Sequence, residues 1–268
     1  MVFADVDENA VHAKNVYPES KLENYYKDET VYTLYFYDFT LKRIKEYFNR
    51  DAGKIRILDF GGGSGIFMRR AQAQGFDIIG VDYSPYAKKA AKLFNLKLLN
   101  TMLTPDLFEK ESFEVVFSHA TYEHLNDPGN ITEMLAPFLK KDGLFIITGV
   151  PNYNTATIHL FRNFWRNMPP GHVNFWTKSS LNNLARKFKF EVKVNRTYGY
   201  NVWYIQEKLN SIKKLLESEN VVIPDKNPLY VNSENLELTF LQKIISRIYF
   251  DFSVPRVGQS VEFWGIKK

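Results

Sequence analysis

The glycine-rich segment DFGGGSG at residues 59–65 constrains the fold of this chain more than any other feature. It lies between a short apolar run, residues 54–60, and a run with helical periodicity, residues 66–74. Because glycine has no side chain, the backbone can turn sharply there and approach a ligand closely. We therefore expect a strand, a ligand-binding loop and a helix, in that order.

Strands and helices are expected to alternate along most of the chain, as they do in a doubly wound parallel sheet. This pattern predicts the α/β class, with a Rossmann-like sheet of seven strands. The expected strands cover residues 54–60, 76–82, 96–99, 113–118, 144–150, 190–198 and 261–266, and the expected helices cover residues 66–74, 84–94, 131–140 and 179–188.

The chain is expected to divide into four segments. Residues 1–50 form an aromatic-rich helical segment, 51–198 the core, 199–256 a helical insertion between the sixth and seventh strands, and 257–268 the final core strand. Two amphipathic helices are expected in the insertion, at 205–218 and 239–252. The apolar stripe of the second helix either packs on the sheet or forms a lid or a dimer interface, so a homodimer is one open alternative.

Composition excludes several classes of protein. The chain has no cysteine, which excludes disulfide scaffolds, thiolate metal sites and cysteine nucleophiles. No run approaches the ~18 apolar residues that a membrane span needs, and the N-terminus is acidic where a signal peptide would be basic. We therefore expect a cytoplasmic protein without a membrane span. The net charge of +5 is a mild excess, which we interpret as a solvated surface and not as a nucleic-acid site.

The glycine loop fits a nucleoside ligand better than a dinucleotide or a nucleoside triphosphate. A dinucleotide fingerprint would need a third glycine where the chain has Ile66 or Met68, and no Gly-Lys-Ser/Thr follows as in a Walker A loop. Asp59 places a carboxylate beside the loop, which suits an ammonium group and not a pyrophosphate. Asp82 closes the second strand, 21 residues after Gly61, where a carboxylate suits ribose hydroxyls.

Five stretches of the chain, in order and at strand ends, resemble the class I S-adenosylmethionine-dependent methyltransferases. The resemblance covers residues from about 50 to 198 and the last strand, and it is closest to the branch of ubiquinone-biosynthesis and other small-molecule or sugar O-methyltransferases. It implies that the last strand of the sheet is antiparallel and that S-adenosylmethionine (SAM) is the cofactor. The stretches are ILDFGGGSG (57–65), GVDYSPYA (80–87), FEVVFSHATYEHLNDP (113–128), LKKDGLFIITGVPNYN (139–154) and PPGHVNFWTKSSL (169–181).

The resemblance also implies which residues hold the cofactor. The glycine loop would cradle its methionine part, Asp82 would bind the ribose diol, and Tyr83 would lie beside the adenine. Met102 and Leu103, before the fourth strand, would cover the adenine, although the acid often found in that loop is missing. The implied cofactor-binding residues are Asp59, Gly61, Gly62, Gly63, Gly65, Asp82, Tyr83, Met102, Leu103 and Ser118.

Histidine is the natural base for a hydroxyl acceptor near neutral pH. We favour His172, which follows the fifth strand at the expected carboxyl edge of the sheet, while His119 closes the fourth strand and could face the donor methyl group. Some ubiquinone-type relatives bind a divalent metal through E-x-x-E-H. Glu123 and His124 match its last two residues, but Ala120 replaces its first Glu. We interpret Glu123 and His124 as a packed or helix-capping pair and expect no metal site.

The sequence therefore predicts an enzyme that O-methylates a small hydroxylated metabolite, with a sugar or sugar nucleotide slightly favoured over a phenol or quinone precursor. N- or C-methylation and a non-catalytic SAM-binding subunit are open alternatives. HATY at residues 119–122 replaces the D/N-P-P-Y motif of amino-methyltransferases, which disfavours DNA bases. We expect residues 199–256, with residues 15–37, to wall the acceptor pocket, because a connection of about 60 residues is far longer than the ~2 to 6 of a tight one.

Overall fold

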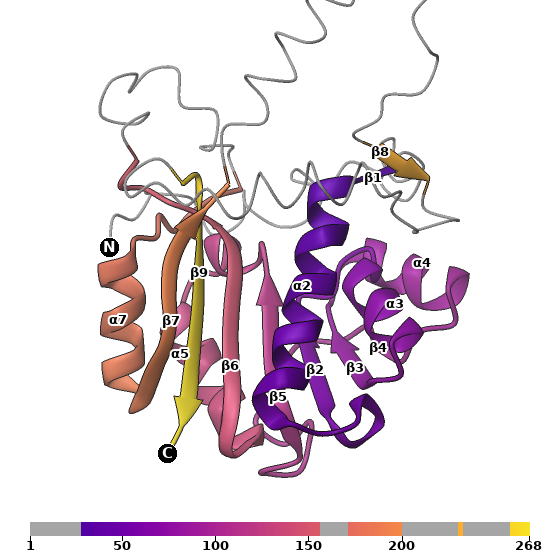
Figure 1. Ribbon diagram of the computed structural model, residues 1–268, viewed down its shortest axis with the longest axis horizontal. Helices are drawn as coiled ribbons and strands as arrows, with labels where there is room; N and C mark the ends of the chain where they lie inside the picture. Colours follow the sequence, from indigo (N-terminus) through magenta and orange to yellow (C-terminus); the bar gives the residue numbers. More distant parts are fainter. Residues whose placement is uncertain (1–27, 156–170, 200–229, 233–257) are drawn as a thin grey trace, which may run out of the picture.

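A computed structural model describes residues 28–155, 171–199, 230–232 and 258–268 of the chain. They form a seven-stranded sheet in the order β4-β3-β2-β5-β6-β9-β7, in which β9 runs antiparallel to both neighbours (Figure 1). This confirms the predicted α/β sheet with an antiparallel last strand. The strands are β2 (Arg56–Phe60), β3 (Asp77–Val81), β4 (Leu98–Leu99), β5 (Phe113–His119), β6 (Leu139–Pro151), β7 (Phe190–Tyr198) and β9 (Ser260–Lys267).

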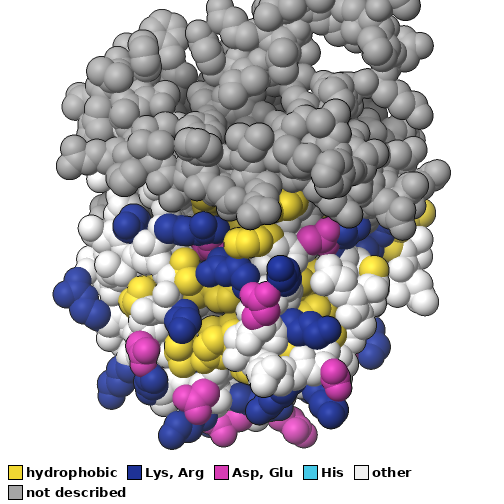
Figure 2. Space-filling model, in the orientation of Figure 1, with side chains coloured by type: hydrophobic (Ala, Val, Ile, Leu, Met, Phe, Trp, Pro, Cys, Tyr) yellow, Lys and Arg dark blue, Asp and Glu magenta, His cyan; other side chains and the backbone are white. Residues whose placement is uncertain are grey.

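Helices cover both faces of the sheet. On β5, the side chains of Val115 and Phe117 are buried in one core cluster and that of Val116 in a second, as expected when successive side chains point to opposite faces. The cover is incomplete at the edge strand β7, where residues 191–193 are exposed. Figure 2 shows hydrophobic side chains between Lys and Arg side chains on the face that is viewed in Figure 1. None of the described helices has the length and apolar character needed to cross a membrane. Helices α2 (Val31–Phe48), α3 (Ile66–Ala73) and α4 (Pro85–Leu93) belong to the first cluster, and α5 (Pro128–Leu135) and α7 (Lys178–Lys187) to the second.

Local sequence explains where the helices begin. Before α4, Oγ of Ser84 accepts a hydrogen bond from the backbone N–H of Ala87 at 3.2 Å, so Ser84 is the N-cap of this helix. Before α7, Thr177 and Ser180 form a capping box, so Thr177 is the cap. Before α3, Gly65 has a φ of 73°, in the left-handed region that favours glycine. The glycine loop therefore leads directly into the first helix of the core.

A buried carboxylate fixes α2 to the sheet. Glu262 of β9 is fully buried and pairs with Arg43 of α2 at 2.7 Å and with Arg196 of β7 at 2.5 Å. A second ion pair joins Asp38 of α2 to Arg70 of α3. These contacts hold α2 across one face of the sheet, where its first turns reach the carboxyl ends of the strands (Figure 1).

Two predicted boundaries are wrong. The helix predicted over 131–140 ends at Leu135, because Pro137 lacks a backbone N–H and disfavours helical backbone at the residue before it. Strand β6 begins at Leu139, earlier than predicted, because Leu139 already pairs with Phe113 of β5. The chain thus enters the strand almost directly from the end of the helix.

The sequence does not predict two short strands, β1 (Asp28–Thr30) and β8 (Tyr230–Asn232), which pair in antiparallel fashion. This pair joins the N-terminal segment to the predicted insertion. Figure 1 shows it beside the start of α2, beyond the edge of the sheet at which β5 ends. The helices predicted at 205–218 and 239–252 lie outside the described residues, and the division into four segments stays a prediction.

Replacing Arg43 by Met tests the anchor of α2. The change leaves Glu262 buried with one cation instead of two, and we expect the free energy of unfolding to fall by about 1–3 kcal/mol. Urea denaturation measures this. Lys42→Met is the matched control, because the Lys42–Glu46 pair on the same helix is exposed and should be worth less than about 0.5 kcal/mol. Equal stability of the two variants would contradict the conclusion that the ion pair of Arg43 with Glu262 fixes α2 to the sheet.

Candidate functional site

The glycine loop lies at the carboxyl end of β2, against the turn that follows β5. A Cβ atom added at Gly61 would lie 2.2 Å from Oγ1 of Thr121, and Gly61 has a φ of 80°, so a larger residue would be strained and would displace that turn. Strands β2 and β5 are parallel neighbours, so the segments that follow them meet at the same edge of the sheet. The predicted loop and the predicted catalytic segment are thereby in contact.

Asp82 follows β3 and is hydrogen-bonded to the glycine loop. Its Oδ2 accepts from the backbone N–H of Gly63 at 2.8 Å, and its Oδ1 accepts from that of Ser84 at 2.7 Å. An ionised carboxylate has about four acceptor positions, so both oxygens retain capacity for a pair of hydroxyls. The structure therefore brings the carboxylate predicted to bind ribose next to the loop predicted to hold the methionine part.

Asp59 is a buried acid without a counter-ion. It is 2% exposed, and its Oδ2 has no hydrogen-bond partner among the described residues. Burial first, and the charge of Asp82 second, raise the pKa of Asp59 to about 8. A Cβ atom added at Gly62 would lie 3.3 Å from this Oδ2, so the glycine keeps the approach to the acid open. An orphaned carboxyl beside an open backbone fits the ammonium group of SAM.

The residues predicted around the adenine have different surroundings. Tyr83 is 55% exposed and Met102 is 62% exposed, so both large side chains are available to cover a flat ring. Leu103 is instead buried in the core cluster of the α5 and α7 face. Ser118 is buried too, and its Oγ has no hydrogen-bond partner in the described part of the chain.

His119 is enclosed by aromatic side chains. The centre of its ring lies 5.1 Å from that of Tyr37 and 5.7 Å from that of Phe36, and its Nδ1 is 3.0 Å from Oγ1 of Thr148. Burial lowers the pKa of His119 to about 4, so the imidazole is neutral at pH 7. It is suited to hydrogen bonding more than to taking up a proton, and its catalytic role stays a prediction.

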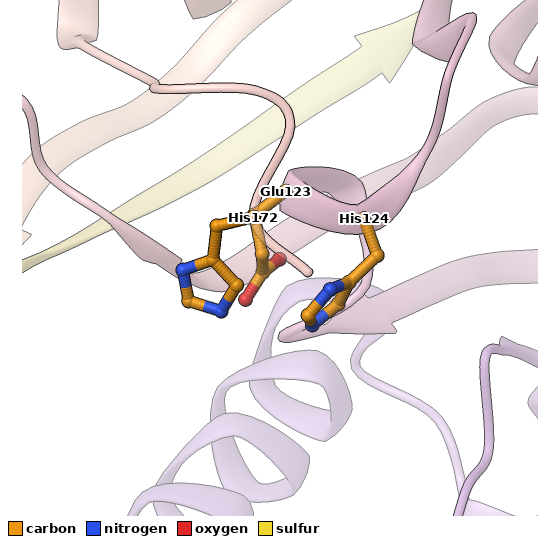
Figure 3. A group of neighbouring side chains, drawn as sticks. All are labelled: Glu123, His124 and His172. Carbon is orange, nitrogen blue, oxygen red and sulfur yellow. The ribbon is translucent and has the colours of Figure 1, made fainter. Parts of the chain in front are cut away.

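Glu123, His124 and His172 form a cluster of potential ligand groups. Glu123 and His124 lie on the short 3-10 turn Tyr122–His124 after β5, and His172 lies before α7. One ligand atom from each residue lies within 4.8 Å of the other two, and Figure 3 shows the carboxylate between the two imidazole rings. Carboxylates and imidazoles both bind metal ions. The expectation of no metal rested on Glu123 and His124 alone, and the structure adds His172 to them.

Hydrogen bonds hold the two segments of this cluster together. The backbone N–H groups of Val173 and Asn174 donate to the carbonyl of Glu123 at 2.8 and 3.0 Å, and Nδ1 of His124 lies 2.7 Å from the carbonyl oxygen of Gly171. Burial raises the pKa of Glu123 to about 8 and lowers the pKa of His124. The cluster is therefore arranged by the backbone, and its surroundings favour uncharged side chains.

Sequence reasoning missed three residues that shape this region. Thr121 touches the glycine loop, Thr148 contacts His119, and Gly171 supplies the carbonyl at His124. All three stand inside stretches that the resemblance covers, but their spacing carries no sign of these contacts. The contacts of Thr148 and Gly171 are visible only once β5, β6 and the segment before α7 are placed side by side.

Residues 32–193 match a protein family described as methyltransferase domain. A protein from Pelagibacter ubique named ubiquinone biosynthesis O-methyltransferase is 29% identical over 113 residues, which are 39% of this chain and 47% of that protein. One of the same name from Bradyrhizobium diazoefficiens is 30% identical over 101 residues, which are 36% of this chain and 40% of that protein. The chain spans less than half the length of these curated relatives.

A solved structure has the same fold. The crystal structure of a SAM-dependent methyltransferase from Archaeoglobus fulgidus matches with a TM-score of 0.54 at 17% identity, over 86% of this chain and 94% of that one. The sheet and the acid-flanked glycine loop thus define an α/β domain for a nucleoside cofactor. The chain belongs to the methyltransferase domain family, within the class I SAM-dependent methyltransferases.

Proton release on cofactor binding tests the role of Asp59. With a pKa of about 8, its carboxyl is mostly protonated at pH 7, and an ammonium group beside it favours the ionised form. We expect SAM binding at pH 7 to release nearly one proton, and fewer above pH 9, where Asp59 is already ionised. Calorimetry in two buffers of different ionisation enthalpy counts these protons. Asp59→Asn should remove the release, and a binding enthalpy of the parent that does not depend on the buffer would contradict this role.

Proposed function

We propose that this chain transfers the methyl group of SAM to a hydroxyl of a small metabolite. The observation that carries the proposal is the position of the Glu123–His124–His172 cluster. The turn that touches the glycine loop through Thr121 also carries Glu123, two residues further on. Groups that can accept a proton therefore follow directly on the residue that borders the cofactor loop.

Such a cluster suits a hydroxyl acceptor. When bound, SAM supplies a methyl group already activated on a sulfonium. The loop and its acids hold and orient the reactants and exclude water, which is the main requirement of a displacement with an activated donor. As the methyl group moves from the sulfonium to the acceptor oxygen, His172, the predicted base, would take the proton of the acceptor hydroxyl. A neutral amine acceptor would have less need of a proton acceptor such as His172.

Two classes of acceptor are supported by different observations. The sequence slightly favours a sugar or sugar nucleotide, whereas the curated relatives are named for ubiquinone biosynthesis, which favours a phenol-like quinone precursor. Either acceptor presents a hydroxyl to the same cluster. A screen of sugar nucleotides and catechols with SAM, read by mass spectrometry, distinguishes the two classes. Turnover of amines alone would instead support N-methylation, and no turnover of labelled SAM with any acceptor would support a non-catalytic subunit.

We also propose that the acceptor pocket is walled by residues 15–37 and 199–256. The pairing of β1 with β8 supports this, because each segment contributes one of these strands. Figure 1 shows the pair beyond the edge of the sheet at which β5 ends, on the side of the glycine loop. A long excursion that returns to this edge is the expected place for residues that select the acceptor.

His172→Ala is the direct test of the proposed chemistry. We expect kcat to fall by about 100-fold or more, because a positioned proton acceptor contributes about 10²–10⁴-fold, while the affinity for SAM is unchanged. Glu133→Gln is the matched control, because Glu133 is exposed on α5 and should be neutral. Steady-state kinetics with the acceptor found in the screen, and calorimetry with SAM, measure both quantities. A His172→Ala enzyme with full activity would contradict the proposal.

A further inference from the structure

We propose that Glu123, His124 and His172 bind one divalent cation, and that this chain prefers ions that favour nitrogen ligands, such as Zn²⁺ and Co²⁺, to Mg²⁺. The inference goes beyond the proposed function, because it concerns binding and does not need turnover. It departs from the sequence-based expectation, which counted two donors where the structure has three.

The geometry of the cluster is that of a ligand set held in place. The ligand atoms of the three residues lie within 4.8 Å of one another, close enough for one ion to contact all three (Figure 3). They come from two segments that are about 50 residues apart in sequence and are joined by backbone hydrogen bonds to the carbonyl of Glu123. A set that is already assembled needs little reorganisation to bind an ion.

His124 has the tautomer that a ligand needs. A carbonyl oxygen only accepts hydrogen bonds, so at 2.7 Å from the carbonyl of Gly171 the Nδ1 atom of His124 carries the proton. The lone pair is then on Nε2. Metal-binding histidines commonly donate their second ring N–H to a carbonyl or carboxylate in this way, which fixes the orientation of the ring.

One oxygen of the buried Glu123 carboxylate has no hydrogen-bond partner among the described residues. The residue is 2% exposed, and the oxygen without a partner is Oε2. An unpaired buried charge is costly, whereas a cation held at the same place by two imidazoles would balance it. The raised pKa of Glu123 has the same cause, the burial of a carboxyl without a counter-ion.

The preference among ions follows from the donor set. Ala120 stands where the E-x-x-E-H pattern has its first Glu, so the cluster contains one carboxylate and two imidazoles. Mg²⁺ prefers six oxygen ligands in an octahedral arrangement, whereas imidazole nitrogen suits Zn²⁺, Co²⁺ and similar ions. Three protein ligands also leave positions open on the ion. An ion bound there would occupy the lone pair of His172, so the ion-loaded chain would not use His172 as the free base that the proposed function assigns to the metal-free chain.

Cobalt absorption tests the proposal without any acceptor. The full chain is freed of metal with a chelator and titrated with Co²⁺, whose visible absorption reports nitrogen ligands. We expect saturation at one ion per chain, displacement by Zn²⁺, and no displacement by a 100-fold excess of Mg²⁺. Glu123→Gln, His124→Asn and His172→Asn should each weaken binding by about 100-fold or more, with circular dichroism to confirm folding, whereas Glu133→Gln should bind like the parent.

Three outcomes would overturn the inference. The first is that the parent chain does not bind Co²⁺. The second is that the three variants bind Co²⁺ as the parent does, which would place the ion on other histidines. The third is that Mg²⁺ displaces Co²⁺ readily. Failure of the proposed function is recognised separately. If Co²⁺ binds as expected but no hydroxyl acceptor is methylated, the cation site stands and the proposed reaction does not.

Discussion

The contact between the glycine loop and the turn after β5 is the constraint on which the rest of the site depends. Strands β2 and β5 are parallel neighbours, so their loops leave the sheet together, and the absence of a side chain at Gly61 lets Thr121 close against the loop. Two acids and the Glu123–His124–His172 cluster lie on the segments that adjoin this contact. Asp82 is tied to the loop through Gly63, and Glu123 follows two residues after Thr121.

Much of the fold was predictable from the sequence, because each core element carries its own local signal. The apolar run of β5, the cap at Ser84 and the glycines of residues 61–65 predict their elements without knowledge of the tertiary structure. These local signals fail where a residue distant in the sequence determines where an element ends or whether it forms. The end of α5 depends on Pro137 and on the early pairing of Leu139 with Phe113, and β1 exists only because β8 lies beside it.

The candidate site divides in the same way. Asp59, Asp82 and the glycines lie within one strand–loop–helix unit and the next, so their spacing predicts them. The spacing does not predict His172 as the third member of the cluster. His172 lies about 50 residues after Glu123 in the sequence, and backbone hydrogen bonds bring the two segments together. The burial that shifts the pKa values of Asp59, His119 and Glu123 is likewise a property of the packed chain and not of the sequence around each residue.

The account rests on SAM binding at the loop between Asp59 and Asp82, and calorimetric titration of an Asp82→Asn variant tests this most directly. A charge-assisted hydrogen bond is worth ~1.5–3 kcal/mol, so the variant should bind SAM about 10- to 150-fold more weakly than the parent. The matched control is Asp77→Asn, which changes a half-exposed acid at the other end of β3 and should bind SAM as the parent does. Unchanged affinity for SAM in Asp82→Asn, or tight binding of NAD by the parent, would contradict the account.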